Sequence, residues 1–196
     1  MLAEIRSALR PAFVLLLLFT VLTGLAYPLT VTGIAQLVFP AQAGGSLVRD
    51  GGKVVGSELI GQNFAASRYF HPRLSAAGKG YDAANSSASN LAPTSKDLAN
   101  RITGDIAALR KQGIAGPIPG DLVTTSASGL DPHISPEAAH LQVKRVAAAR
   151  QLDVKAIDDA VFAATEYPLF GIIGEPRVNV LLLNRQIDRI SAKPAA

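Results

Sequence analysis

The chain has 196 residues, no cysteine and a formal net charge of +4 at pH 7. Without disulfides, a domain of this size must be stabilised by its hydrophobic core alone. The basic residues are interspersed with acidic ones instead of clustered, which argues against nucleic-acid binding.

An uncharged stretch from residue 11 to residue 48 is the first element of the chain. Ala12–Ile34 is mostly apolar, and about 20 such residues in a helix cross a hydrocarbon core of about 30 Å. Pro28 removes one helical hydrogen bond, so we expect a kink or a helix end near Tyr27-Pro28. The sequence therefore predicts one transmembrane helix with its exit segment over residues 11–39.

Small or weakly polar residues within this helix, among them Thr23 and Gly24, would let a second helix approach closely. We take Thr23 and Gly24 as candidates for contact with a partner. Membrane helices also tolerate such residues without any partner, and the sequence does not decide between the two interpretations.

Flanking charges predict the orientation of the helix. Arg6 and Arg10 outnumber Glu4 on its N-terminal side, and the positive-inside tendency then leaves residues 1–10 in the cytoplasm. Residues 40–196 would form one soluble extracytoplasmic domain.

A cleaved signal peptide is the competing interpretation of the N-terminal part. Ala41-Gln42-Ala43 resembles a cleavage site, but it lies well beyond the apolar run, whereas the apolar region of a signal peptide is only about 7–15 residues long. We therefore favour a retained membrane anchor.

The soluble part mixes short predicted strands with three predicted helices. Strands are expected at residues 53–55, 57–61, 122–125 and 178–183, the last one buried, and an extended segment is expected at 68–73. Helices are expected from Thr94 or Ser95 to Gly113, from Ser135 to about Arg150, and from Asp153 to a point before Pro168. Residues 76–93 form a long loop that is either mobile or fixed by a partner. The pattern is typical of an α+β or α/β fold with few strands.

An acid, an imidazole and a hydroxyl occur within five positions, as Asp131, His133 and Ser135, with Pro132 between the first two. A hydrolase triad needs such groups aimed at one another, usually from separate elements. Ser135 is better used as a helix cap, and no G-x-S-x-G motif accompanies it. We therefore favour a folding or docking role, and these four residues are candidates for a partner interface.

No other pattern indicates catalysis or a bound cofactor. The three histidines, His71, His133 and His140, are not at the spacing of metal ligands, and the glycine-lysine pairs do not match a phosphate-binding loop. A last polar cluster, Glu175, Arg177 and Asn179, stands at the start of the predicted buried strand. It reads equally as a turn with a local ion pair or as an interaction edge.

Several blocks of the sequence resemble the C-subunit family (KdpC) of the bacterial Kdp potassium-transporting ATPase. They are Tyr69-Phe70-His71-Pro72-Arg73-Leu74-Ser75-Ala76, Ser89-Asn90-Leu91, Leu122 to Ala139, Gln142-Val143-Lys144-Arg145-Val146-Ala147, and Gly174 to Asn184. The resemblance covers essentially the whole chain, including the N-terminal helix.

The resemblance implies a non-catalytic accessory subunit of an ATP-driven potassium importer in the bacterial inner membrane. Its partners would be a channel-like potassium-translocating subunit, a P-type ATPase subunit and a small one-helix subunit, and these partners would handle ATP and potassium. The family's C subunit is described as raising the ATP affinity of the ATPase subunit. A domain outside the membrane cannot touch cytoplasmic ATP, so this effect would travel through the membrane helix, or the domain would mainly stabilise assembly.

Two functions of other classes remain as alternatives. One is a membrane-anchored periplasmic hydrolase that uses Asp131, His133 and Ser135. The other is a secreted binding module released after Ala43.

Overall fold

The computed structural model describes residues 2–192 of the chain. It divides into two compact units, one ending at Leu47 and the other beginning at Val48. The first unit is helical and consists of α1 (Leu2–Val21), a π-helical turn η1 (Leu22–Ala26), α2 (Tyr27–Val38) and the short α3 (Pro40–Ala43).

Ala3–Val38 is the one helical stretch among the described residues that is long and apolar enough to cross a membrane. None of its most apolar window is buried, so it is not the core helix of a soluble domain. The irregularity expected near Pro28 is present as the π-helical turn, and Pro28 falls in the first turn of α2. A proline at this position cannot donate to the carbonyl of residue 24, which explains the wider turn there.

A hairpin of β1 (Leu47–Asp50) and β2 (Lys53–Ser57) begins at the boundary, and all of it after Leu47 belongs to the second unit. Gly51 and Gly52 form its two-residue loop with φ values of +53° and +83°, a conformation that glycine adopts without strain. The strand expected at 53–55 is therefore confirmed. The strand expected at 57–61 is wrong, because Gly61 instead donates its N–H to the carbonyl of Leu130 at 2.7 Å.

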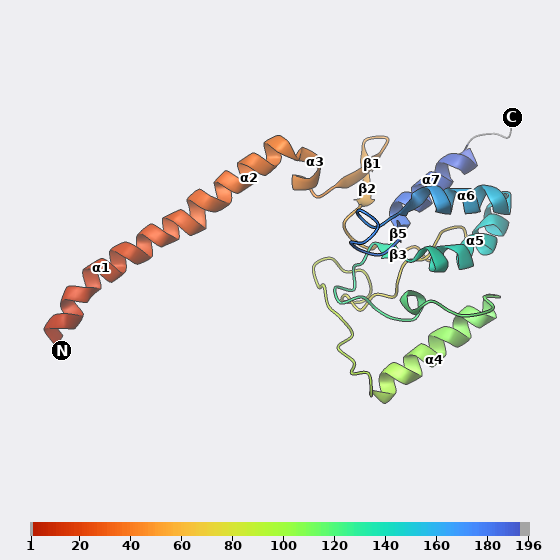
Figure 1. Ribbon diagram of the computed structural model, residues 1–196, viewed down its shortest axis with the longest axis horizontal. Helices are drawn as coiled ribbons and strands as arrows, with labels where there is room; N and C mark the ends of the chain where they lie inside the picture. Colours follow the sequence, from red (N-terminus) through yellow and green to blue (C-terminus); the bar gives the residue numbers. More distant parts are fainter. Residues whose placement is uncertain (1, 193–196) are drawn as a thin grey trace. The chain divides into compact units, whose positions relative to one another are not determined.

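Four α-helices, a 3-10 turn and a small antiparallel sheet form the rest of this unit among the described residues (Figure 1). The elements are α4 (Lys96–Lys111), the 3-10 turn η2 (Gly120–Leu122), β3 (His133–Ile134), α5 (Pro136–Arg150), α6 (Val154–Ala164), β4 (Thr165–Glu166), β5 (Arg177–Asn179) and α7 (Val180–Ala192). The strand order is β3-β5-β4, with His133 opposite Asn179 and Thr165 opposite Val178. The antiparallel pairing makes the fold α+β.

The core lies where α5, α6 and α7 pack around β5. Its fully buried members include Phe70, Ile134, Ile157, Leu183 and Ile187. Figure 1 shows these three helices gathered together, whereas α4 contributes no buried residue and meets the core only through the partly buried Leu109. The unit is therefore held by its C-terminal half and by the one segment around Phe70 that enters the core.

The three predicted helices are confirmed as α4, α5 and α6. Ser95 is the N-cap residue of α4, and the left-handed Gly113 follows its end. The Ser135 hydroxyl accepts a hydrogen bond from the N–H of Ala138 at 3.1 Å, and the Asp153 carboxylate accepts one from the N–H of Lys155 at 3.3 Å. These caps satisfy backbone donors that a helix start otherwise leaves unpaired.

Two further predicted strands, besides the one at 57–61, are wrong. At 122–125 the chain forms η2 and a single parallel bridge between Thr125 and Leu74. At 178–183 only the first two residues are in a strand, because Asn179 caps a helix there: its side-chain oxygen accepts the N–H of Leu182 at 3.2 Å. A short apolar run suits a buried strand and a buried helix equally well, and the cap decides between them.

The long loop at 76–93 is fixed by its own chain. The Tyr81 hydroxyl donates to the carbonyl of Arg73 at 2.6 Å, and the Ser87 hydroxyl donates to that of Ala76 at 2.7 Å. Gly129 approaches so closely that a Cβ there would lie 2.6 Å from Ser87 O. The loop is therefore held in place by contacts within its own chain.

Candidate functional site

Residues 67–71 form a turn that runs into irregular chain, so the extended conformation expected from residue 68 does not begin there. Helices of the second unit bind this segment through its backbone. Buried amide side chains hold its centre. Asn184 on α7 accepts the N–H of Phe70 at 2.7 Å and donates to its carbonyl at 2.9 Å. Gln142 on α5 does the same for His71, at 2.7 Å and 3.1 Å. Each amide thus pairs with both the N–H and the C=O of one residue, as a neighbouring strand would. We call residues 67–71 the strap.

Two arginines of α5 hold the other part of the strap. Arg145 donates to the carbonyls of Ser67 and Tyr69, and Arg150 donates to that of Arg68. The Arg150 side chain is only 2% exposed, and it also forms a 2.8 Å ion pair with Asp188. The guanidinium lies 4.9 Å from the centre of the Tyr69 ring, which adds a cation–π contact. The strap is thereby joined to both α5 and α7.

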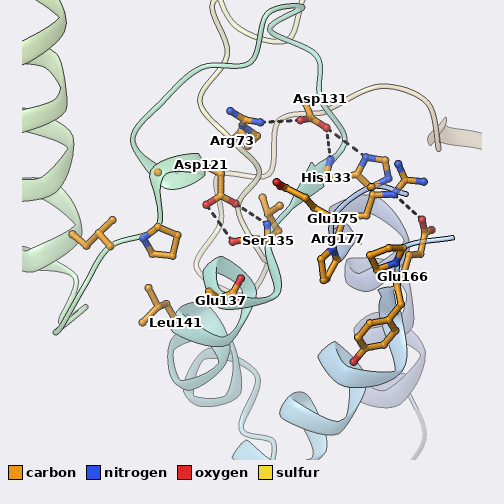
Figure 2. A pocket seen from close by; sticks show the side chains of 18 of the residues that line it. Arg73, Asp121, Asp131, His133, Ser135, Glu137, Leu141, Glu166, Glu175 and Arg177 are labelled. Atoms are coloured by element: carbon orange, nitrogen blue, oxygen red, sulfur yellow. Dashed lines mark hydrogen bonds and ion pairs between the residues drawn. The ribbon is translucent and has the colours of Figure 1, made fainter. Parts of the chain in front are cut away.

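Asp131 is the centre of a charged cluster beside the strap (Figure 2). One carboxylate oxygen accepts from Arg73 at 3.0 Å, and the other accepts the backbone N–H of His133 at 3.0 Å. The His133 ring nitrogen Nδ1 lies 3.4 Å from the same oxygen. Burial by itself would raise the pKa of Asp131, but the hydrogen bonds from His133 and the charge of Arg73 outweigh it and lower the pKa to about 2.

A second carboxylate fixes the start of α5. Asp121 accepts the backbone N–H of Ser135 at 2.7 Å and its hydroxyl at 3.2 Å. The hydroxyl of Ser135 is therefore used by Asp121 and by the helix cap, and the structure shows no hydrogen bond from it to His133. Asp131, His133 and Ser135 thus stand close together without the nucleophile–base contact of a hydrolase triad.

These residues border a cleft of about 1090 Å³. One wall is the Asp131–Ser135 segment with Arg73. The other is formed by residues 166–169 and 173–177, and residues 117–121 also line the cleft. Arg177 forms an ion pair with Glu166 at 2.9 Å across β5 and β4. Figure 2 shows Glu175 on the same side of the cleft as Arg177.

The structure gathers most of the interface candidates predicted from the sequence, but not all. Asp131, His133, Ser135, Glu175 and Arg177 line the cleft together. Pro132 borders a smaller hollow of about 520 Å³, and its carbonyl accepts the N–H of Val180 at 3.0 Å.

Asn179 points elsewhere, because its amide donates to the carbonyl of Glu58 at 2.9 Å and its oxygen caps α7. Thr23 and Gly24 lie in the N-terminal unit. The Thr23 hydroxyl donates to the carbonyl of Phe19 at 2.6 Å, and Gly24 has open space beside it.

The three histidines serve separate local contacts. His71 Nε2 lies 3.2 Å from the carbonyl of Ala66, and His140 Nδ1 lies 2.7 Å from Asp158. Within the described residues 2–192, no three His, Cys, Asp or Glu side chains are grouped so that they could hold a metal ion.

The fold and the site define a class: an apolar helix of membrane-spanning length joined to a small α+β unit whose polar residues serve binding and folding. The profile of the family described as "KdpC: K+-transporting ATPase, c chain" matches residues 9–189. The chain belongs to this family, and it is a non-catalytic accessory subunit of a potassium-transporting ATPase.

Curated relatives named "Potassium-transporting ATPase KdpC subunit" match over nearly full length. The protein from Myxococcus xanthus is 59% identical over 172 residues, which are 86% of this chain and 82% of the relative. The protein from Caulobacter vibrioides is 58% identical over 183 residues, 93% of each chain, and that from Bradyrhizobium diazoefficiens is 53% identical over 197 residues, 94% and 98%. Neither the hydrolase nor the secreted binding module finds support here.

Sequence reasoning missed the residues that hold the strap. The sequence predicted no contact for Gln142, Arg145 or Asn184, which lie in the blocks that resemble the family. It predicted Arg150 only as the end of a helix. A signal exists in hindsight: Gln142 and Asn184 are polar residues on otherwise buried helix faces. Buried amides need partners, and here each finds both a donor and an acceptor on the strap.

Proposed function

We propose that the chain is anchored in the bacterial inner membrane with residues 1–10 in the cytoplasm, 11–39 crossing the bilayer and 40–196 outside. There it stabilises the assembly of the potassium-importing complex, raises the ATP affinity of the P-type ATPase subunit, or does both. The observation that carries this proposal is the family match at 9–189, which includes both the apolar helix and the soluble unit. Arg6 and Arg10, set against Glu4, favour this orientation.

The partners in this proposal are the channel-like subunit, the P-type ATPase subunit and the small one-helix subunit. Asp131, His133, Glu175 and Arg177 are proposed to meet a partner outside the membrane, together with the neighbouring Pro132, Ser135 and Asn179. Thr23 and Gly24 are proposed to meet one within the membrane. ATP and potassium stay with the partners, so an effect on ATP affinity has to reach the cytoplasm through the helix.

Affinity purification of the tagged full-length chain from native membranes in mild detergent tests the proposal. Mass spectrometry of the eluate should find a P-type ATPase and a channel-like subunit in a stable ratio. A chain that is recovered alone from the soluble fraction, beginning at Gly44, would contradict both the anchor and the assembly.

A further inference from the structure

The segment between β4 and β5 exposes an unusual amount of apolar surface. We call residues 167–173 the apolar tip. Phe170 is 84% exposed and Ile172 is 83% exposed, and Tyr167, Leu169 and Ile173 are each more than half exposed. Soluble domains seldom expose large apolar side chains in such density unless the surface meets a partner.

The apolar tip is held in a fixed shape by its own backbone. Leu169 and Ile173 exchange two hydrogen bonds, both of 3.1 Å, and Gly171 donates to the carbonyl of Pro168 at 3.0 Å. Phe170 has a φ of +55°, which a bulky side chain adopts only at a cost in conformational energy. The turn therefore presents Phe170 and Ile172 to solvent in a prearranged position, and a fixed shape lowers the entropic cost of binding.

The apolar tip continues into the cleft described above, because Leu169 and Ile173 line that cleft while Phe170 and Ile172 do not. A partner that covers the tip would therefore also meet the cleft. Five carboxylates line the cleft against two guanidinium groups, a formal charge of −3. This charge is opposite in sign to the net charge of the whole chain.

Two of the five carboxylates lack a partner in the structure. Asp121, Asp131 and Glu166 are bound to Ser135, to Arg73 and to Arg177, as described. Glu137 and Glu175 make no hydrogen bond or ion pair with any described residue, and Figure 2 draws no contact for either. A Lys or Arg side chain that enters the cleft could pair with these two carboxylates, because its positive charge is complementary to the negative charge of the cleft.

We propose that the apolar tip and the acidic cleft together form a docking surface for a partner subunit, through a segment that presents an apolar side chain beside a Lys or Arg. This inference rests on the proposed function, because it needs a partner protein in the complex. A lipid surface fits less well, since the −3 charge of the cleft repels the phosphate groups of lipids.

The experiment uses the full-length tagged chain and measures how tightly it retains the other subunits in detergent. Phe170→Ser/Ile172→Ser should weaken retention at least about tenfold, because exposed aromatic and large aliphatic anchors dominate interfaces of this kind. Val54→Ser/Val154→Ser, at two other exposed apolar positions, is the matched control and should leave retention unchanged. Glu175→Lys should weaken retention and flatten its dependence on salt, whereas Glu58→Lys at another exposed position should do neither.

A photo-reactive benzoylphenylalanine at position 170 identifies the occupant directly. The proposal expects a crosslink to a protein segment of another subunit that contains a Lys or Arg. Crosslinks to lipid, to a second copy of this chain, or to nothing while the complex is intact would overturn it. Failure of the unmodified chain to retain an ATPase would overturn the proposed function as well, whereas unaffected tip variants in an intact complex would overturn the docking surface alone.

Discussion

Asp131 links electrostatics to stability at the scale of a single residue. Its pKa in the folded chain is about 2, below the 3.8 of an unperturbed carboxyl, so folding favours the ionised form. This stabilisation is fully present above pH 3.8 and is lost as the pH falls toward 2. Since one pKa unit corresponds to about 1.4 kcal/mol, Asp131→Asn should lower the free energy of unfolding at pH 7 by about 2 kcal/mol.

Urea unfolding of the detergent-solubilised chain, followed by circular dichroism at several pH values, measures this effect. The variant should also lose the part of the acid sensitivity that lies between pH 4 and pH 2. Glu58→Gln, at an exposed carboxyl, is the control and should keep both the stability and the acid sensitivity. If Asp131→Asn retained the acid sensitivity of the natural chain, the ionised carboxylate of Asp131, with its contacts to His133 and Arg73, would not be the source of that sensitivity.

His71 predicts a second pH dependence, at higher pH. Burial lowers its pKa below 6.5, the nearby charge of Arg145 lowers it further, and the carbonyl of Ala66 opposes both. The unfolded chain then binds the proton first as the pH falls, so stability is full above pH 6.5 and declines below it. His71→Gln should reduce the decline in the free energy of unfolding between pH 7 and pH 5, measured by the same urea titration. An unchanged decline would contradict the burial of this imidazole.

At the scale of an element, the strap has no regular secondary structure and is held by side chains of α5 and α7. Asn184 is 1% exposed and pairs with both polar backbone groups of Phe70. Asn184→Leu keeps the number of side-chain heavy atoms but leaves those two groups unpaired inside the core, at a cost of about 1–3 kcal/mol each. We expect a loss of about 2–4 kcal/mol in the free energy of unfolding, against less than about 0.5 kcal/mol for Asn100→Leu on the exposed surface of α4.

Combining a substitution at Gln142 with Asn184→Leu tests whether the two amides stabilise the strap as one cooperative unit. Because Asn184 and Gln142 bind adjacent residues of the strap, the double variant should cost less than the two single variants together. A fully additive loss would mean that the strap is not a cooperative unit, and an Asn184→Leu variant as stable as the natural chain would mean that the pairing with Phe70 contributes nothing.

Sequence reasoning succeeded where the determinants of an element are local. Ser135, Asp153 and Gly113 mark helix ends through contacts within a few residues, and all three were recognised. It failed for α7, because an apolar run is compatible with both a strand and a helix. The helix cap at Asn179, which distinguishes the two, was not recognised. It also failed at 122–125, where one bridge to Leu74 replaces the expected strand.

The site was predictable only in part, for the same reason. The grouping of Asp131, His133 and Ser135 follows from adjacency in the chain, and their place in the cleft beside Arg177 does not. The contacts that hold the strap join residues 71 and 114 positions apart in the sequence. Such pairs depend on how α5 and α7 pack, which hydrophobic periodicity alone does not specify.

The orientation of the N-terminal helix is testable because the chain has no cysteine of its own. A single introduced thiol is therefore the only reactive one. With Arg6 and Arg10 retained in the cytoplasm, Lys111→Cys on the exposed end of α4 should react with a membrane-impermeant thiol reagent in intact spheroplasts. Ser7→Cys should react only after lysis. The reverse pattern would contradict the proposed orientation.

At the scale of the whole molecule, the proposed arrangement joins two environments through one helix. The hydrophobic core of the second unit is built from residues of that unit. The helix carries no charged residue between Arg10 and Arg49, so what it can transmit is its position and its packing against other helices. The π-helical turn at Leu22–Ala26 and the open surface at Gly24 are the places where such packing could differ between two states.

Coupling of this kind has a thermodynamic requirement that can be measured. If the subunit raises the equilibrium affinity of the complex for ATP by some factor, ATP must tighten the association of the subunit by the same factor. One measurement is the affinity for nucleotide without turnover, with and without the subunit. The other is the association of the subunit, with and without a non-hydrolysable ATP analogue. We expect the two factors to be equal.

Replacing residues 3–38 by an unrelated membrane helix should abolish both factors together. If the analogue left the association unchanged while the subunit still shifted ATP affinity, the coupling would be refuted. If the replacement preserved both factors, the path through the helix would be refuted, and the soluble unit would have to act on its partners outside the membrane.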